Sequence, residues 1–278
     1  MWKRKLGISL GNHYSEPTPK LIKLVKKIGF DAVSPEWESG DLKAIVDAAN
    51  ECGAVIQSLH APFVCSAAMW SEDKSVSEPA LNELLQSLED CHKYNIPVLV
   101  AHVWIGFENI PEPTQAGLEN YGKLVEKAAV FGIKIAFENT EGDEHLYAIM
   151  DYFKGNPTVG YCWDSGHEMC YNHSEDLLGR YGDRLIMTHI NDNLGIRNFN
   201  GETSATDDLH LLPFDGVADW DYNAERLKKS TLPEYLNFEL NIQSKPGRHE
   251  NDCYSKMTYE EYFTEAYKRA CRVAYKLY

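Results

Sequence analysis

Several short apolar runs in the sequence end at a side chain that can bind a metal ion. The stretch LIMTHINDN (185–193) begins as a buried strand would and then places His189, Asn191 and Asp192 where an apolar chain should simply turn. An ionisable side chain is costly to bury there unless a partner satisfies it. We expect His189 to face a metal ion, while Asn191 and Asp192 brace the following turn. From the third run onward, the last residues are His60, His102, Glu138, Asp164, His189 and Glu239.

Three further candidate ligands lie close to these positions in the sequence. His167 follows Asp164 by three residues in WDSGH, and Asp208 and His210 belong to the DDLH stretch. Mixed imidazole and carboxylate ligands suit zinc or manganese better than calcium or a structural cysteine site. A lone strand-end histidine is more often a hydrogen-bonded core residue, so the prediction rests on the group. The most strongly indicated metal ligands are Glu138, Asp164, His189 and Glu239.

The other histidines do not follow this pattern. None of them ends an apolar run, so each is expected at the surface or in a loop, and the acidic side chain of Glu141 is expected in a solvated loop. These histidines are His13, His92, His145, His173 and His249.

Eight apolar runs rich in Val, Ile and Leu must position these side chains. Longer amphipathic stretches such as TPKLIKLVKKIG and LENYGKLVEKAAVFG separate them, and several of these stretches end in Gly, as helices often do. This alternation predicts a (β/α)8 TIM barrel that forms a single domain over residues 1–278, with an open doubly wound sheet as the alternative. In such a barrel the active site lies where the strands end. The predicted strands are 5–10, 30–35, 54–60, 97–102, 133–138, 158–164, 184–189 and 235–239.

Composition and charge limit the classes of partner. The 278 residues are 44% hydrophobic and 25% charged, which is typical of a soluble globular protein. A net charge of -15 argues against nucleic acid, because phosphate contacts require a basic surface. No stretch resembles a signal peptide or a membrane span, so we expect a cytoplasmic protein without a membrane partner. The seven cysteines form no C-x-x-C pair and are expected to be reduced thiols.

A series of motifs in this order resembles the xylose isomerase-like barrel superfamily. This superfamily includes sugar isomerases and epimerases, and also the endonuclease IV type of apurinic DNA-repair enzyme. The resemblance covers nearly the whole chain and implies a TIM barrel with a metal-dependent active site. The matching motifs are SLHAPF, VAHVW, AFENT, CWDSGH, MTHINDN, DDLHLLPFDGVADW and NFEL.

The resemblance to ketose epimerases implies a specific set of roles. It implies one manganese or magnesium ion bound by Glu138, Asp164, His189 and Glu239. It also implies that Glu138 and Glu239 exchange protons with opposite faces of the substrate through an enediolate. His167 and Glu144 match substrate-binding positions. Where those epimerases carry an arginine after strand seven, this chain has Gly195, with Arg197 two residues later as the predicted substrate contact.

The endonuclease IV branch offers a second interpretation. There, three zinc ions bind nine residues, and all nine have counterparts among the candidate ligands. The acidic charge and the short connection between the sixth and seventh strands argue against abasic DNA as the substrate. The DDLHLLPFDGVADW stretch also resembles the sugar phosphate isomerase/epimerase branch more closely, and we favour that branch.

The expected cofactor and partners follow from the favoured branch. We expect one to three divalent ions per chain, chosen from manganese, magnesium, cobalt and zinc, and a small-molecule sugar or sugar phosphate as substrate. Related barrels are often dimers or tetramers, which leaves a homo-oligomer as an open expectation. A third interpretation is a barrel that binds a sugar without catalysis, although a pure binder has no need for opposed carboxylates.

Overall fold

Parallel strands form the centre of the structure, a computed structural model that describes residues 4–38, 40–196 and 202–278. The described strands fall into two sheets with the orders β3-β2-β1-β9 and β4-β5-β6-β7-β8. Their bounds are β1 Lys5–Leu10, β2 Ala32–Pro35, β3 Val55–Ile56, β4 Leu59–His60, β5 Val98–His102, β6 Lys134–Glu138, β7 Val159–Asp164, β8 Leu185–His189 and β9 Tyr235–Phe238.

Backbone contacts at two seams close the sheets into a barrel. At one seam Glu36 bridges to His60, and the Trp37 amide donates to the His60 carbonyl at 2.9 Å. At the other seam Ile190 bridges to Phe238, and the Ile190 amide donates to the carbonyl of Asn237 at 2.9 Å. The predicted (β/α)8 barrel is therefore confirmed. Both seams lie at the carboxyl ends of the strands, which fixes the rim on which the candidate ligands lie.

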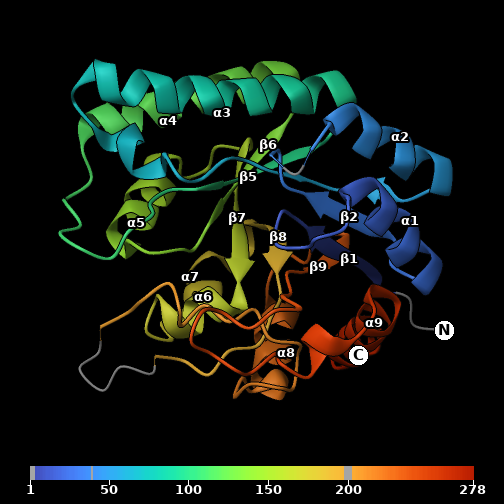
Figure 1. Ribbon diagram of the computed structural model, residues 1–278. Helices are drawn as coiled ribbons and strands as arrows, with labels where there is room; N and C mark the ends of the chain where they lie inside the picture. The colour runs from blue at the N-terminus through green and yellow to red at the C-terminus, as the bar shows by residue number, and fades with distance from the viewer. Residues whose placement is uncertain (1–3, 39, 197–201) are drawn as a thin grey trace.

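The helices pack around the outside of the barrel. In Figure 1, α3 and α4 run side by side along one flank, and α1 lies beside both α2 and α9. Local signals set their ends: Asp73 caps α3 by accepting from the Ser75 amide, and α4 ends at Gly132 with φ 69°. The α-helices are α1 Thr18–Ile28, α2 Leu42–Cys52, α3 Lys74–Tyr94, α4 Gln115–Phe131, α5 Asp143–Tyr152, α6 Ser165–Cys170, α7 Leu177–Tyr181, α8 Trp220–Lys229 and α9 Tyr259–Tyr275.

The third predicted strand differs from the observed structure. Residues 54–60 were expected as one strand, but the chain divides into β3 and β4, which belong to different sheets. The cause is a pair of polar side chains between them that turn into the barrel interior. Gln57 donates to Asn237 Oδ1 at 2.5 Å, and the Ser58 hydroxyl lies 2.6 Å from that of Ser34. A side chain at Gly7 would displace Gln57 from this contact.

One part of the barrel interior below the rim is apolar, in contrast to the polar contacts around Gln57. Val100, Ala136, Cys162 and Met187 form a separate buried cluster, while the larger core lies between the strands and the helices. All seven cysteines are free thiols, as predicted. Of the helices in the described part of the chain, none is both long enough and apolar enough to cross a membrane.

Candidate active site and metal centre

The carboxyl ends of the strands gather the predicted ligands into one layer. His102 pairs in register with Glu138 on the neighbouring strand, and Asp164 pairs with His189. His60 ends β4, and Glu239 directly follows β9. Because parallel strands end at the same rim, residues far apart in sequence become neighbours here.

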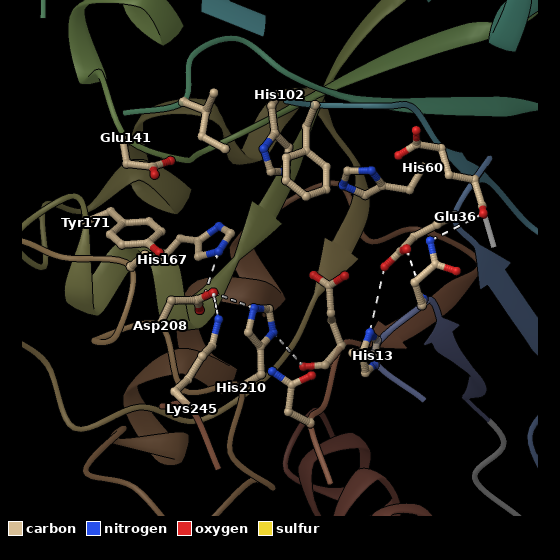
Figure 2. Close-up of a pocket in the computed structure, with 17 residues that line it drawn as sticks. His13, Glu36, His60, His102, Glu141, His167, Tyr171, Asp208, His210 and Lys245 are labelled. Carbon is tan, nitrogen blue, oxygen red and sulfur yellow. Dashed lines mark hydrogen bonds and ion pairs between the residues drawn. The ribbon is translucent and has the colours of Figure 1, made fainter. Parts of the chain in front are cut away.

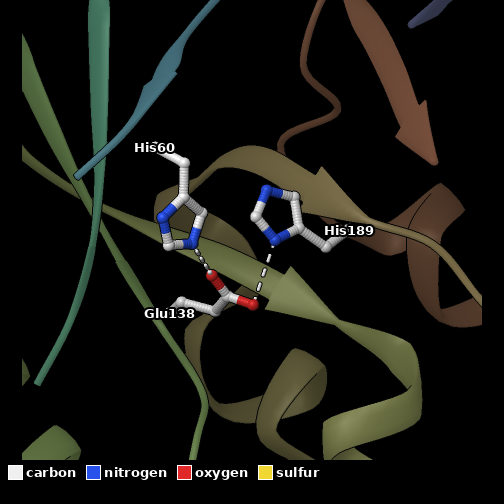
Figure 3. Close-up of side chains that lie close together, drawn as sticks. All are labelled: His60, Glu138 and His189. Carbon is white, nitrogen blue, oxygen red and sulfur yellow. Dashed lines mark hydrogen bonds and ion pairs between the residues drawn. The ribbon is translucent and has the colours of Figure 1, made fainter. Parts of the chain in front are cut away.

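Glu138 lies at the centre of this layer and is 0% exposed. Its Oε1 lies 3.0 Å from His189 Nδ1, and its Oε2 lies 3.4 Å from the Nε2 atoms of both His60 and His102. Figure 3 shows the carboxylate between the rings of His60 and His189. Burial raises the pKa of Glu138, but the imidazoles of His189 and His102 outweigh that effect and hold it well below its usual range. The group is therefore an ionised carboxylate.

Three groups of side chains have ligand atoms close enough to share an ion. Within each group these atoms lie within 4.8 Å of one another. His102 stands outside the groups but reaches the same Glu138 oxygen as His60. The groups are His60, Glu138 and His189; His167, Asp208 and His210; and Glu138, Asp164, His189 and Glu239.

The donor set fits a divalent cation. Glu138 Oε2 and Asp208 Oδ1 are buried, lie 3.4 and 3.5 Å from neighbouring imidazole nitrogens, and make no hydrogen bond to the described residues. Leaving such oxygens unsatisfied costs on the order of 1–3 kcal/mol each, and more when they are charged. Coordination to a cation would satisfy them, and carboxylate oxygen combined with imidazole nitrogen is a ligand set suited to zinc or manganese.

Asn191 holds Asp164 in place. Its Nδ2 donates to both carboxylate oxygens of Asp164, at 3.1 and 2.9 Å, and the His167 amide donates to Oδ1 at 2.7 Å. A Cβ at Gly166 would lie 1.9 Å from Asn191 Oδ1, so the close approach depends on that glycine. Burial raises the pKa of Asp164. Positioning a ligand through hydrogen bonds in this way tunes metal affinity.

Asp192 braces the long loop that follows β8. Its carboxylate accepts from the amides of Phe214 and Ala218 at 2.8 and 3.0 Å, and from the indole of Trp220 at 3.0 Å. Asn191 therefore supports the predicted ligand Asp164, and Asp192 supports the loop.

The same loop carries Asp208 and His210, which lie against the strand ends. His210 Nε2 lies 2.8 Å from Asp208 Oδ2, and its Nδ1 lies 3.1 Å from the Glu239 carbonyl. Arg248 holds the loop by donating to the Thr206 carbonyl at 2.8 Å. His210 has a φ of 46°, a conformation that non-glycine residues rarely adopt outside constrained sites.

A polar cavity of about 450 Å³ opens onto these ligands. Glu239 faces it with a side chain that is 15% exposed, whereas Glu138 lies beneath. Figure 2 shows His13 and Glu36 on one side and Glu141, Tyr171 and Asp208 on the other. Several lining residues were not predicted from the sequence: Asn12, His13, Glu36, Glu38, Glu141, Tyr171 and Lys245.

One predicted substrate contact, Glu144, does not reach the cavity. Glu144 is exposed on α5 and is not among the lining residues, whereas Glu141 is. Arg197 lies outside the described residues. His167, the third predicted contact, lines the cavity. One expectation about the other histidines was wrong, because His145 is fully buried on α5. His13 is exposed in the loop after β1, as expected, and it also lines the cavity.

Residues 22–273 match the model of the family described as xylose isomerase-like TIM barrel. The chain therefore belongs to this family, and the resemblance inferred from its motifs is confirmed.

Solved structures of low sequence identity share the fold. The IolI protein with a bound zinc atom superposes with a TM-score of 0.73 at 20% identity, over 98% of this chain and 99% of that one. D-psicose 3-epimerase in the presence of D-fructose gives 0.70 at 16% identity, over 96% and 99%. A fusion protein of a xylose isomerase-like barrel and 4-hydroxyphenylpyruvate dioxygenase gives 0.72 at 13% identity; the match covers 97% of this chain and 43% of that protein.

One curated relative matches over part of its length. It is an uncharacterized protein of Sinorhizobium fredii (strain NBRC 101917 / NGR234), 42% identical over 102 residues. The match covers 36% of this chain and 30% of that protein.

Proposed function

We propose that the protein is a metal-dependent sugar isomerase or epimerase. The observation that carries this proposal is the pair of glutamates on one ligand group. Glu138 and Glu239 approach the same atom, His189 Nδ1, at 3.0 and 2.9 Å. A sugar bound at this group has two carboxylates within reach, which is what proton removal and return at one carbon require.

The proposed residue roles follow from exposure and charge. Glu239 faces the cavity and removes the proton from the carbon beside the substrate carbonyl, and it then releases that proton to solvent. Glu138, which is ionised at rest, takes up a proton from solvent before it returns one to the opposite face of the carbon. The reaction breaks and remakes one C–H bond and needs no oxidant. Burial raises the pKa of Glu239, but His189 and His210 outweigh it and hold the pKa below its usual range, so the group is ionised and ready to accept a proton.

A divalent ion would complete this centre. Glu138, Asp164, His189 and Glu239 would hold it, and His167 would bind substrate oxygens from its place in the cavity wall. When bound, such an ion polarises the substrate carbonyl and stabilises negative charge that develops on its oxygen. Asn191 and Gly166 keep Asp164 aligned for that role.

Cavity size and relatives add support. A space of about 450 Å³ is within the range of small-ligand sites and suits a monosaccharide. Family neighbours of the same fold include proteins described as L-ribulose 3-epimerase and, from E. coli, 3-keto-D-glucoside 4-epimerase.

The test compares wild-type protein with Glu239→Gln in the rate at which each exchanges a carbon-bound proton of the substrate with solvent. Manganese-loaded wild-type protein should exchange the carbon-bound proton of D-fructose or D-allulose with D2O, followed by NMR. We expect Glu239→Gln to lower that rate by about a hundredfold to ten-thousandfold while the protein still folds. Glu126→Gln, an exposed substitution on α4, is the matched control. Full exchange by Glu239→Gln would overturn the assigned role.

The remaining ligands support a second candidate, a trinuclear zinc phosphodiesterase acting on abasic DNA. A single-ion epimerase has no need for the separate group of His167, Asp208 and His210. Elemental analysis of protein purified without chelators decides between the two candidates. Close to three zinc ions per chain, with cleavage of abasic DNA, would favour the phosphodiesterase, whereas about one manganese, cobalt or magnesium ion would favour the isomerase.

A further inference from the structure

A preorganised carboxylate lies across the cavity from His167 and Asp208. It belongs to Glu36, the residue that follows β2, and its side chain is 27% exposed (Figure 2). The Asn12 amide donates to its Oε2 at 3.1 Å. His13 Nδ1 lies 3.7 Å from its Oε1. Glu36 is thus oriented from the end of β1 without contributing to any of the three ligand groups.

Gly11 is what allows this arrangement. A Cβ at Gly11 would lie 1.8 Å from Glu36 Oε1 and 2.2 Å from its carboxyl carbon. The carboxylate therefore lies directly against the backbone at the end of β1, and a side chain at position 11 would displace it from this place. A group held by a glycine, a backbone amide and an imidazole has a fixed direction, which is the property a specificity-determining contact needs.

The charge around Glu36 restricts what can bind there. Outside the predicted ligands, the cavity wall carries the acidic residues Glu36, Glu38 and Glu141. Among the described lining residues Lys245 is the one Lys or Arg, and its ammonium lies 3.3 Å from Asp208 Oδ2. A phosphate placed beside Glu36 would meet like charge, while Lys245 lies on the other side of the cavity and is paired with Asp208 (Figure 2).

We propose that Glu36 binds hydroxyl groups at the end of the substrate away from the reacting carbon, and that the substrate is therefore an unphosphorylated, neutral sugar. This inference rests on the proposed isomerase or epimerase function and names the class of substrate for that same cavity. An ionised carboxylate is an acceptor with two oxygens, so it can accept from two neighbouring hydroxyls of a sugar through charge-assisted hydrogen bonds.

Wild-type protein tests the substrate class directly. D-fructose, D-allulose and D-tagatose would be compared with their 6-phosphates, each with manganese-loaded protein, by proton exchange and product formation. We expect kcat/KM to be at least about tenfold higher for the free sugars. A preference for the 6-phosphates would overturn the inference and leave the proposed function standing. Absence of exchange with every sugar and phosphate would instead contradict the proposed function itself.

Substitutions at Glu36 test its role. Glu36→Gln should raise KM for the preferred free sugar by about tenfold with kcat within about twofold, and should narrow the preference over the 6-phosphate. Glu36→Asp, which keeps the charge, should retain that preference. Glu126→Gln is the control, and circular dichroism with thermal melting checks folding. If Glu36→Gln lowered kcat without changing KM, or kept the wild-type preference for the free sugar over its 6-phosphate, Glu36 would not determine specificity. If Glu36→Gln does not fold, the comparison of free sugars and 6-phosphates with wild-type protein still tests the substrate class.

Discussion

Buried imidazoles occur in two very different surroundings in this protein. On α6, His167 lies among carboxylates, with Asp208 Oδ1 at 3.5 Å and Glu138 Oε1 at 3.3 Å. On α5, His145 lies between two indoles, stacked on Trp104 at 4.4 Å and edge-on to Trp70 at 4.6 Å. Both nitrogens of His145 lack a hydrogen-bond partner within the described part of the chain.

The pKa values of the two rings move in opposite directions. Burial lowers the pKa of His167, but Asp164 and Asp208 outweigh it and raise the pKa well above its usual range. Burial lowers the pKa of His145 to about 4, and the opposing effect of the exposed Glu144 is smaller. The difference shows that burial does not decide what a histidine does; the charge beside it does. Only the first surroundings, rich in anionic oxygen, suit a cation.

Of the substitutions that test this contrast, Glu138→Gln should have the largest effect on metal binding and activity. The substitution preserves size but removes the negative charge that the surrounding imidazoles face. We expect metal content to fall sharply and proton exchange to fall by about a thousandfold or more. Metal per chain after dialysis against manganese and exchange by NMR are the measurements, with Glu126→Gln as control. A Glu138→Gln protein that kept its metal and its exchange would contradict the role assigned to Glu138. Sugar binding by the wild-type protein without any exchange would instead point to a non-catalytic barrel.

A smaller effect should follow from Gly166→Ala, which disturbs the support of the metal centre rather than a ligand. The added Cβ would displace Asn191, which holds both oxygens of Asp164. We expect manganese affinity to fall by about tenfold to a hundredfold, and the free energy of unfolding to fall by about 1–3 kcal/mol.

Gly122→Ala provides the matched control for this substitution. A Cβ at Gly122 meets nothing within 4 Å, and the residue lies inside α4, so alanine should be neutral or stabilising by up to about 1 kcal/mol. Calorimetric manganese titration and urea unfolding measure the two quantities. Wild-type affinity in Gly166→Ala would mean that Asn191 is not needed to position Asp164.

Much of the metal centre could be predicted because the rule behind it is local. An apolar run followed by an ionisable residue marks the carboxyl end of a barrel strand, and this placed His60, Glu138 and His189 at one rim before any contact was known. The same rule, extended to the first two strands, would also have found Glu36, which directly follows the predicted strand 30–35.

Other parts of the site had no signal of this kind. Lys245 and Arg248 lie in the connection after β9, and only tertiary contacts bring them to Asp208 and Thr206. The division of the third strand depends on Gln57 meeting Asn237 across the barrel, which no local pattern shows. His145 is different, because the helical spacing of His145, Leu146 and Ile149 indicates one buried face of α5.

The smallest expected effect is on protein stability, comes from His145, and appears only at acidic pH. Because the folded pKa of His145 is about 4, below the usual value of 6.5, the unfolded chain binds more protons between these two values. The contribution of His145 to stability is therefore present above pH 6.5 and is lost as the pH falls towards 4.

The substitution His145→Phe tests this, because a ring of similar size then has no proton to bind. At pH 7 the free energy of unfolding of the variant should lie within about 1 kcal/mol of the wild-type value, and at pH 4.5 the variant should be more stable than wild type. The measurement is the urea unfolding midpoint of both metal-free proteins from pH 4.5 to 7.5. Because both proteins contain the same metal-binding side chains, subtracting one curve from the other cancels the titration of those side chains. Parallel pH curves would mean that the Trp70–His145–Trp104 stack admits a charged ring, and the contrast between the two environments would then lie in their carboxylates alone.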